Sequence, residues 1–424
     1  MRLLKINIKN MPRFREDIDI DFITKQRVAE DDKEKLFHIF SNIYANQVLS
    51  FIGINASGKT TILKVISFVI NMLNNEALNS IKSKEILNDL AEKKKVKITS
   101  FFYNENCIYK LETVITKEIN PVDKEEKLVI SEETLWEKDA GKVKTKKSLF
   151  DFENTDIIIE RNQKEQFLLS DVSVMIAINK KKQSNFPIRD MLKWTNHNML
   201  NILGIFPKEL LTFLDPSIEY FKCNTEKKPA DIRLKFYASD EIILNSPLEI
   251  EKYLSSGTIK GINVFMNALL CFIEGGYLIV DELENHFNEE IVTTLVRFFM
   301  NPSVNKNGAT LIYSTHYSEL LDELNSCAAR QIVLLYSGMA SLRLPTRRMS
   351  CTSGITLKRS QISCWGWGAL STALPSPSNI SSTFTSTFSP EGFMISMVSP
   401  TQNLFRWVMR TSPFSGFASS IIPK

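Results

Sequence analysis

A glycine-rich octapeptide follows a short apolar run near the start of this chain of 424 residues. Residues 53–60 read Gly-Ile-Asn-Ala-Ser-Gly-Lys-Thr and match the pattern G-x-x-x-x-G-K-[ST] at every defined position. The apolar run at 48–52 predicts a buried strand before it, and the spacing at 62–73 predicts a helix after it. A turn between such elements directs backbone N–H groups at one concavity, which suits a polyphosphate.

Two residues of this loop have predictable chemistry. In loops of this pattern the lysine reaches the β- and γ-phosphates, and the Ser or Thr hydroxyl after it binds Mg²⁺. Lys59 and Thr60 occupy these two positions. The sequence therefore predicts that the chain binds a nucleoside triphosphate, ATP in the first place, together with Mg²⁺.

Charge is unevenly distributed along the chain. The 52 Lys and Arg and 48 Asp and Glu residues give a formal net charge of +4, but nine of the basic and one of the acidic residues lie in 327–424. The first 326 residues therefore carry 43 basic and 47 acidic side chains. A basic excess often indicates a nucleic-acid partner, but here it lies entirely in 327–424. Charge therefore gives such a partner little support.

Neither membrane insertion nor secretion is indicated. We find no run of about 18 apolar residues and no signal-peptide pattern at the start of the chain, where basic residues interleave with apolar ones. The six cysteines are scattered, with no C-x-x-C pair, so neither a zinc site nor a disulfide framework is predicted. We expect a cytoplasmic protein with no membrane partner.

Apolar periodicity divides the first 325 residues into three parts. Residues 1–76 and 251–325 read as the two halves of a nucleotide-binding sheet with its helices. Residues 77–250 read as inserted antiparallel strands and helices, beginning with a helix at 77–95. We therefore predict an α/β P-loop NTPase head, a mixed sheet flanked by helices, with a large inserted α+β lobe. The elements predicted for the second half of the head are a helix at 258–273, a strand at 277–280, a helix at 289–300 and a strand at 310–314.

Residues 326–424 differ in composition from the rest. Lys, Asp and Glu become rare there, Ser, Thr, Pro and Trp become frequent, and no apolar period is readable. One interpretation is a flexible Ser/Thr/Pro-rich tail. The other is a shifted reading frame near 325–327, which the many Phe, Met, Ile and Trp residues favour.

An acidic pair ends the apolar strand predicted at 277–280. Asp281 and Glu282 follow it directly, as in the Walker B arrangement, where the Asp holds Mg²⁺ and the Glu polarises the attacking water. Alone, two acids after a strand can simply cap the next element. With the phosphate loop upstream, they indicate a metal residue, Asp281, and a general base, Glu282.

Two further strings have both a structural and a functional interpretation. Leu-Ser-Ser-Gly-Thr at 254–258 precedes a predicted helix, so Ser255 and Gly257 either form an ordinary N-cap or place an anion site at a second helix N-terminus. His316 follows the strand predicted at 310–314 and is either incidental or able to hydrogen-bond a γ-phosphate. The order of all four strings favours the functional interpretation.

These strings together resemble one family of ATPases. The sequences LLKINIKNMPRF, GINASGKT, LSSGT, YLIVDELEN and STHYSELLD lie between residues 3 and 322. They resemble the ABC-type branch of P-loop ATPases, in particular the RecF/SMC/OLD-like group labelled AAA15 or AAA_21, and within it the RloA-like abortive-infection ATPases.

The resemblance implies a role for each matching residue. Two ABC-type heads dimerise head to tail, so that Ser255 and Gly257 bind the nucleotide of the other subunit. Glu282, Lys59 and His316 are then the catalytic residues, His316 as the switch histidine, and Thr60 and Asp281 hold the metal. The residues that bind the nucleotide within one chain are Gly53, Asn55, Ala56, Ser57, Gly58, Lys59, Thr60 and Thr61.

Two functions follow as hypotheses. The first is an ATPase whose ATP-dependent homodimerisation regulates a separate effector protein in anti-phage defence, as the abortive-infection resemblance implies. The alternative is a RecF-like DNA-maintenance ATPase. The ATP-binding subunit of a transporter is a weaker hypothesis, because residues 77–250 form a long polar insertion. A further hypothesis is that the protein binds ATP poorly or folds badly, if residues 326–424 replace a C-terminal part that the ATPase head requires.

Overall fold

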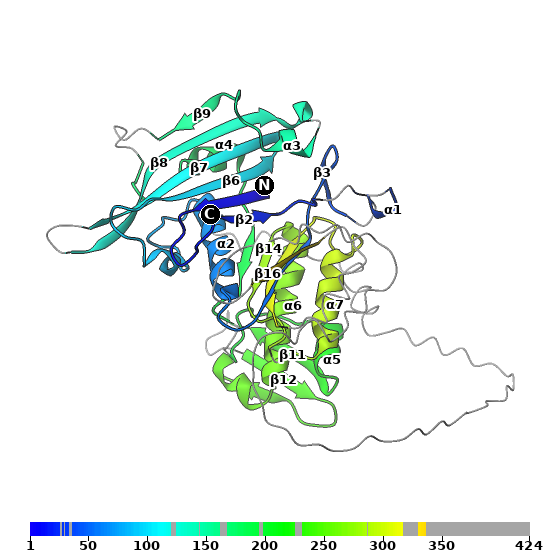
Figure 1. Ribbon diagram of the computed structural model, residues 1–424. Coiled ribbons are helices and arrows are strands. Elements are labelled where there is room, and N and C mark those ends of the chain that lie inside the picture. The colour runs from blue at the N-terminus through cyan, green and yellow to red at the C-terminus, as the bar shows by residue number, and fades with distance from the viewer. Residues whose placement is uncertain are drawn as a thin grey trace, which may run out of the picture. The chain divides into compact units, whose positions relative to one another are not determined.

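The computed structural model describes most of the first 335 residues (Figure 1). Residues 336–424, and with them nearly all of the segment predicted as an atypical tail, lie outside the described residues. Within 1–335, the gaps in the description are residues 26–27, 29, 34–35, 120–123, 144, 162–167, 195–197, 225–230, 286 and 317–329.

A five-stranded sheet carries the phosphate loop. Every neighbouring pair of its strands is parallel. The three central strands are apolar and buried along their length, as expected where both faces of a parallel sheet are covered. In spatial order the strands are β10 (Ile188–Asp190), β14 (Tyr277–Val280), β15 (Thr310–Thr315), β5 (Val48–Gly53) and β16 (Arg330–Leu335).

Helices cover both faces of this sheet. α2 (Lys59–Leu73) packs on one face, in a core that includes Leu49, Ile279 and Ile312. α6 (Ser256–Glu274) and α7 (Glu289–Met300) pack on the other face. The alternation of side chains along each strand therefore supplies two separate cores.

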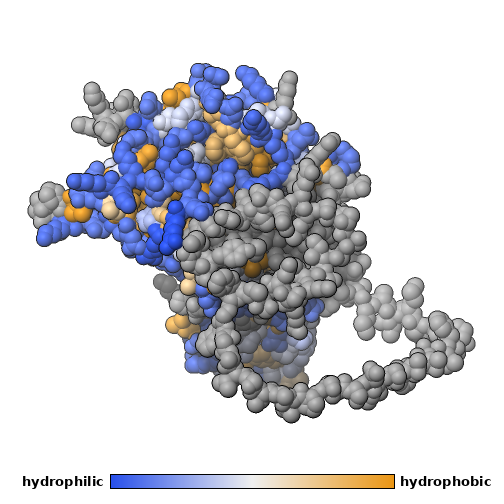
Figure 2. Space-filling view, viewed as in Figure 1, coloured by the Kyte–Doolittle hydropathy of each residue, from blue (hydrophilic) through white to orange (hydrophobic). Residues whose placement is uncertain are grey.

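A second, six-stranded sheet is antiparallel, and its apolar side shares a core with α2. Cross-strand ion pairs such as Lys97–Glu112 (2.7 Å) lie on it, and Figure 2 shows that its part of the visible surface is mainly hydrophilic. In spatial order the strands are β2 (Ile18–Asp21), β1 (Arg2–Lys9), β6 (Val96–Asn104), β7 (Cys107–Ile119), β8 (Glu126–Asp139) and β9 (Ile157–Glu160).

A third, three-stranded sheet packs with α5 (Lys208–Leu214) against the start of α6. Its strands are β11 (Ile218–Asn224), β12 (Asp231–Phe236) and β13 (Ile242–Leu244), in that order. The remaining elements are α1 (Glu30–Lys33), β3 (His38–Phe40), β4 (Ile43–Tyr44), η1 (Lys84–Leu87), η2 (Ala140–Lys142), α3 (Lys146–Leu149), α4 (Met175–Lys182) and η3 (Pro247–Lys252).

The sheet predicted as mixed is in fact two sheets. All strands around the phosphate loop are parallel, and the antiparallel strands form their own sheet. That sheet combines β1 and β2, from the segment 1–76, with β6 to β9, from the segment 77–250. The predicted boundary at residue 76 therefore does not separate two structural units, because the first two strands belong with the later ones.

The helix predicted at 77–95 is wrong. This segment holds only the short η1 and a series of turns. Leu78 and Ile81 are buried at helix-like spacing, but Leu78 N donates to Asp171 O (2.8 Å) and Asn79 Nδ2 to Leu128 O (2.9 Å). Other backbone hydrogen bonds of the segment close short turns, such as Lys84 N to Ile81 O (3.1 Å). The apolar residues pack into the core that α2 shares with the antiparallel sheet, and no long helix forms.

β16 lies inside the segment predicted as the atypical tail. Its residues pair with β5 from Arg330↔Val48 to Leu335↔Gly53. The parallel sheet therefore extends at least to Leu335, ten residues beyond the predicted end of the head at residue 325.

α6 is unusually apolar for a helix next to a functional site. Among the described residues, it is the one helix whose length and composition would allow it to cross a membrane, and 67% of its most apolar window is buried inside the protein. Packing against α5, β10 and β14 explains this composition.

Gly276 marks a close approach between β14 and the segment before β10. A Cβ at this position would lie 2.5 Å from Pro187 O, which also accepts a hydrogen bond from Tyr277 N (2.8 Å). We expect Gly276→Ala to lower the free energy of unfolding by about 1–3 kcal/mol, because the backbone must move. Urea unfolding measures this; Gly141→Ala, whose Cβ would meet the exposed Asp139 side chain, serves as the control and should change it by much less.

Candidate nucleotide-binding site

The phosphate loop joins β5 to α2 at the carboxyl end of the parallel sheet. Ala56 and Gly58 adopt positive φ angles of 60° and 94°, which turn the chain into the helix. A Cβ at Gly58 would meet no atom within 4 Å, so the φ angle is what favours glycine there. Among the described residues no side chain caps α2 at Gly58. The first N–H groups of α2 are therefore directed at the loop and can bind an anion.

Lys59 closes this loop from the inside. Its side chain is buried, and Nζ donates to Gly53 O (2.8 Å) and Ile54 O (3.0 Å) and lies 3.4 Å from His316 Nδ1. Burial lowers the pKa of Lys59, and the nearby carboxylates, Asp281 first among them, oppose that change. The result is an ammonium group held at the loop by neutral acceptors, which phosphate oxygens can replace.

Asp281 is held between α2 and β15. Its Oδ2 accepts a hydrogen bond from Thr60 Oγ1 (2.7 Å), and its Oδ1 accepts one from Ser314 Oγ. Ser314 Oγ also accepts from Glu282 N (2.8 Å). Because Val280 pairs with Tyr313 and Ser314 with Phe51, the strand ends bring these groups to one edge of the sheet. Ser314 is a site residue that the sequence did not single out, although its polar side chain ends an apolar strand.

The pairing of Thr60 with Asp281 fits a magnesium site. A hydroxyl and a carboxylate oxygen are hard ligands of the kind that Mg²⁺ prefers. No cluster of three or more His, Cys, Asp or Glu side chains able to hold a metal occurs in the described part of the chain. Mg²⁺ is usually bound through one or two protein oxygens together with phosphate and water.

Glu282 has a strained backbone fixed from two sides. Its φ angle is 45°, in the left-handed region, which costs on the order of 1 kcal/mol for a residue with a side chain. Its N–H donates to Ser314 Oγ, and its carbonyl oxygen accepts from Lys260 Nζ (3.0 Å). The side chain is half-buried. The predicted general base thus lies next to the metal residue on a constrained turn.

Glu284 is a buried acid that the sequence analysis missed. Its Oε1 accepts a hydrogen bond from His316 N (2.7 Å), and its side chain is 9% exposed. Oε2 is buried and has no hydrogen-bond partner among the described residues. Burial lowers the pKa of both Lys59 and Lys260, and the charge of Glu284 is among those that oppose the change. The only signal in the sequence was a third acid soon after Asp281.

Lys260 is the second residue that the sequence analysis missed. It lies near the start of α6 and is 5% exposed. Burial lowers its pKa to about 8, although Glu284, Glu282 and Asp281 oppose the change. Its Nζ lies 5.4 Å from the centre of the Phe287 ring. In the sequence, Lys260 is a single lysine within an apolar helical stretch, and nothing there indicates that it lies at the site.

The other predicted residues of the loop differ in exposure. Asn55 and Ala56 are exposed at the tip of the loop, and Thr61 is half-buried in the first turn of α2. Ser57 is buried, and its Oγ has no hydrogen-bond partner among the described residues. The loop is therefore open at its tip and keeps an unpaired hydroxyl inside.

Ser255 and Gly257 lie at the start of α6. Ser255 is its N-cap, with Oγ accepting from Thr258 N (3.0 Å). Ser255 is exposed and Gly257 half-buried. The N-cap interpretation is confirmed, and none of the hydrogen bonds described for Ser255 reaches the phosphate loop of its own chain. A role in binding a second nucleotide stays a prediction.

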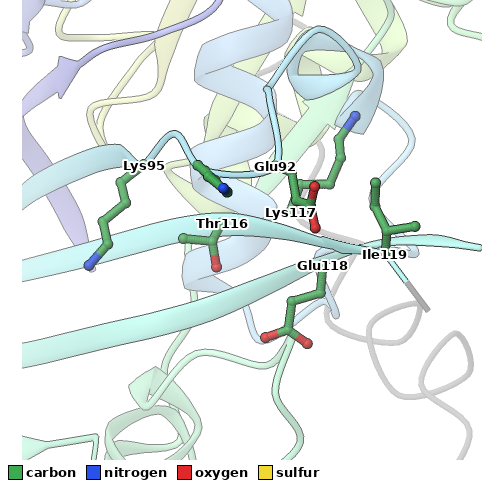
Figure 3. Close-up of a pocket in the computed structure, with 7 residues that line it drawn as sticks. Glu92, Lys95, Thr116, Lys117, Glu118 and Ile119 are labelled. Carbon is green, nitrogen blue, oxygen red and sulfur yellow. The ribbon is translucent and has the colours of Figure 1, made fainter. Parts of the chain in front are cut away.

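A cavity of about 580 Å³ lies elsewhere, on the antiparallel sheet (Figure 3). In Figure 3, Thr116 and Glu118 point to one side of β7 and Ile119 to the other. Two of its lysines are paired with acids: Lys117 with Glu126 (2.8 Å) and Lys95 with Glu132 (2.6 Å). It contains none of the predicted site residues.

Comparison with known families decides the family of this chain. The model of the AAA_21 family, described as "AAA domain, putative AbiEii toxin, Type IV TA system", matches residues 48–322, well over half of the chain. The chain belongs to the AAA_21 family. The matched span begins at β5 and contains Lys59, Asp281 and His316. No curated protein matches the chain.

Membership fixes the broad class of this AAA_21 protein. It is a P-loop ATPase of AAA type, a class that uses a nucleotide and usually Mg²⁺. The mixed α/β architecture agrees with that class. In the structure, Lys59, Thr60, Asp281, Glu282 and His316 meet at one edge of the parallel sheet.

Proposed function

We propose that this AAA_21 protein hydrolyses ATP in the presence of Mg²⁺. The observation that carries the proposal is the hydrogen bond of Thr60 to Asp281 beside the Lys59 ammonium. Lys59 and the N-terminus of α2 supply positive charge for the phosphates, and Thr60 and Asp281 supply oxygen ligands for the metal. Mg²⁺, when bound, neutralises the charge that develops on the phosphates. Glu282 would accept the proton of the attacking water.

Metal dependence tests this assignment directly. We expect ATP to bind more tightly with Mg²⁺ than with EDTA, and we expect Asp281→Asn to remove most of that difference and to abolish turnover. Titration calorimetry and phosphate release are the measurements. Asp240→Asn, in an exposed turn, should behave like the wild type. Wild-type protein that neither binds nor hydrolyses ATP at any Mg²⁺ concentration would contradict the proposal.

We further propose that two copies associate head to tail when ATP binds. The start of α6, with the exposed Ser255 and the half-buried Gly257, would then contact the nucleotide of the other copy. Two facts support this: His316 at the nucleotide edge is exposed, and so is the tip of the phosphate loop. His316 and the tip of the phosphate loop are therefore both accessible to a second chain.

The biological role we propose is regulation of a separate effector protein in anti-phage defence, in the cytoplasm. Support comes from the words "putative AbiEii toxin, Type IV TA system" in the family description and from the resemblance to RloA-like ATPases. Co-purification of the ATP-bound dimer from the native host, compared with the nucleotide-free protein, tests for the effector. ATP-dependent, salt-sensitive binding of duplex DNA without such a partner would instead favour the RecF-like alternative.

A further inference from the structure

Burying the ammonium group of Lys260 in its apolar surroundings costs free energy of folding. Its side chain is buried on the apolar helix α6, and its Nζ donates to a neutral acceptor, the carbonyl oxygen of Glu282, at 3.0 Å. None of the ion pairs found among the described residues involves Lys260. Burying an ammonium group without a directly paired carboxylate is unfavourable. An apolar side chain of similar length would therefore serve the fold of α6 at least as well.

The acceptor of Lys260 lies at the most constrained point of the site. Glu282 has a φ angle of 45°, and its N–H is fixed by Ser314 Oγ (2.8 Å). Lys260 fixes the opposite side of the same residue through the carbonyl oxygen. Without that hydrogen bond, the backbone could relax from the left-handed region, and the side chain of Glu282 would turn away from its present direction.

We propose that Lys260 is a positioning residue for ATP hydrolysis, which holds the turn at Glu282 in its reactive conformation and links it to the start of α6. The inference rests on the proposed ATPase function. Because Ser255 and Gly257 lie at the start of the same helix, a movement of α6 on dimerisation would reach Glu282 through Lys260. Hydrolysis in one copy would then depend on what the start of its own α6 contacts.

Three variants test the inference. Lys260→Met keeps the length of the side chain and removes the charge and the donor; Lys260→Arg keeps both. Lys252→Met removes an exposed lysine of η3 that lies just before α6 and pairs with Glu249 (3.6 Å), and serves as the matched control. For each protein, the kcat and KM for ATP, the affinity for ATP in EDTA, and the Tm are measured.

We expect Lys260→Met to lower kcat about 10- to 100-fold, since a misplacement of about 1 Å can cost as much. Its affinity for ATP should stay within about twofold, because the phosphate loop is intact, and its Tm should be equal or higher. Lys260→Arg should recover part of kcat. A merely structural lysine would instead lower Tm and kcat together.

Two results would overturn the inference. A kcat for Lys260→Met equal to that of Lys252→Met would refute the positioning role of Lys260 but would not contradict the proposed ATPase function. A lowered Tm, with Arg restoring Tm but not kcat, would refute positioning through the carbonyl. Failure of the proposed function itself is recognised separately, because the wild type would then show no turnover.

Discussion

Lys59→Ala should reduce the affinity for ATP by at least about 30-fold and turnover to background. The ammonium group is buried and fixed by Gly53 O and Ile54 O, so its removal leaves the loop without its central positive charge. Truncating a buried, hydrogen-bonded charge at a binding site costs about 2–5 kcal/mol, which corresponds to that change or a larger one. Nucleotide titration by calorimetry measures it.

The matched control for Lys59 lies on the same helix. Lys64 pairs with Glu85 at 2.6 Å on the exposed side of α2, and Lys64→Ala should leave the affinity for ATP within about twofold, as is usual for a surface ion pair. The Tm of Lys59→Ala should not fall, because the variant removes a desolvated charge. Unchanged ATP affinity in Lys59→Ala would contradict the site.

Glu282→Gln should separate binding from hydrolysis. Loss of a general base typically lowers kcat by about 10²–10⁴-fold, whereas the phosphate loop and Asp281 remain intact. The backbone hydrogen bonds of residue 282 are also retained, since Ser314 and Lys260 contact its N–H and carbonyl groups. ATP should therefore accumulate on the protein, and size-exclusion chromatography with ATP should show a dimer.

Glu290→Gln is the control for this variant, because Glu290 is an exposed acid in the first turn of α7. It should turn over ATP like the wild type. Dimer formation and turnover test different parts of the proposed function. If Glu282→Gln stays monomeric with bound ATP, head-to-tail association is contradicted. If it has a normal kcat, Glu282 is not the general base.

Much of the parallel sheet could be predicted from the sequence. β14 and α7 have the predicted bounds, and β5 and β15 extend one residue further. Buried parallel strands are recognisable because they are continuous apolar runs between turn residues. The segment 77–95 shows the limit of this approach, because residues of a turn-rich segment can be buried at helix-like spacing, as Leu78 and Ile81 are.

The rest of the site could not be predicted because it depends on pairings between distant residues. Lys59 and His316 are 257 positions apart, and Thr60 and Asp281 are 221 apart. The motifs identified these residues but not their contacts. Ser314 and Glu284 lie within the strings STHYSELLD and YLIVDELEN, but these strings assign them no role, and Lys260 lies outside every such string. Their roles follow from hydrogen bonds between distant segments.

β15 lies between the strand of the phosphate loop and the strand of the acidic pair. It therefore acts as a spacer that sets their alignment. Successive residues of a strand face opposite sides, so a slip of one residue would move Ser314 away from Asp281 and put Tyr313 or Thr315 at its position. We therefore expect any insertion or deletion within residues 310–316 to separate the phosphate loop from the acidic pair.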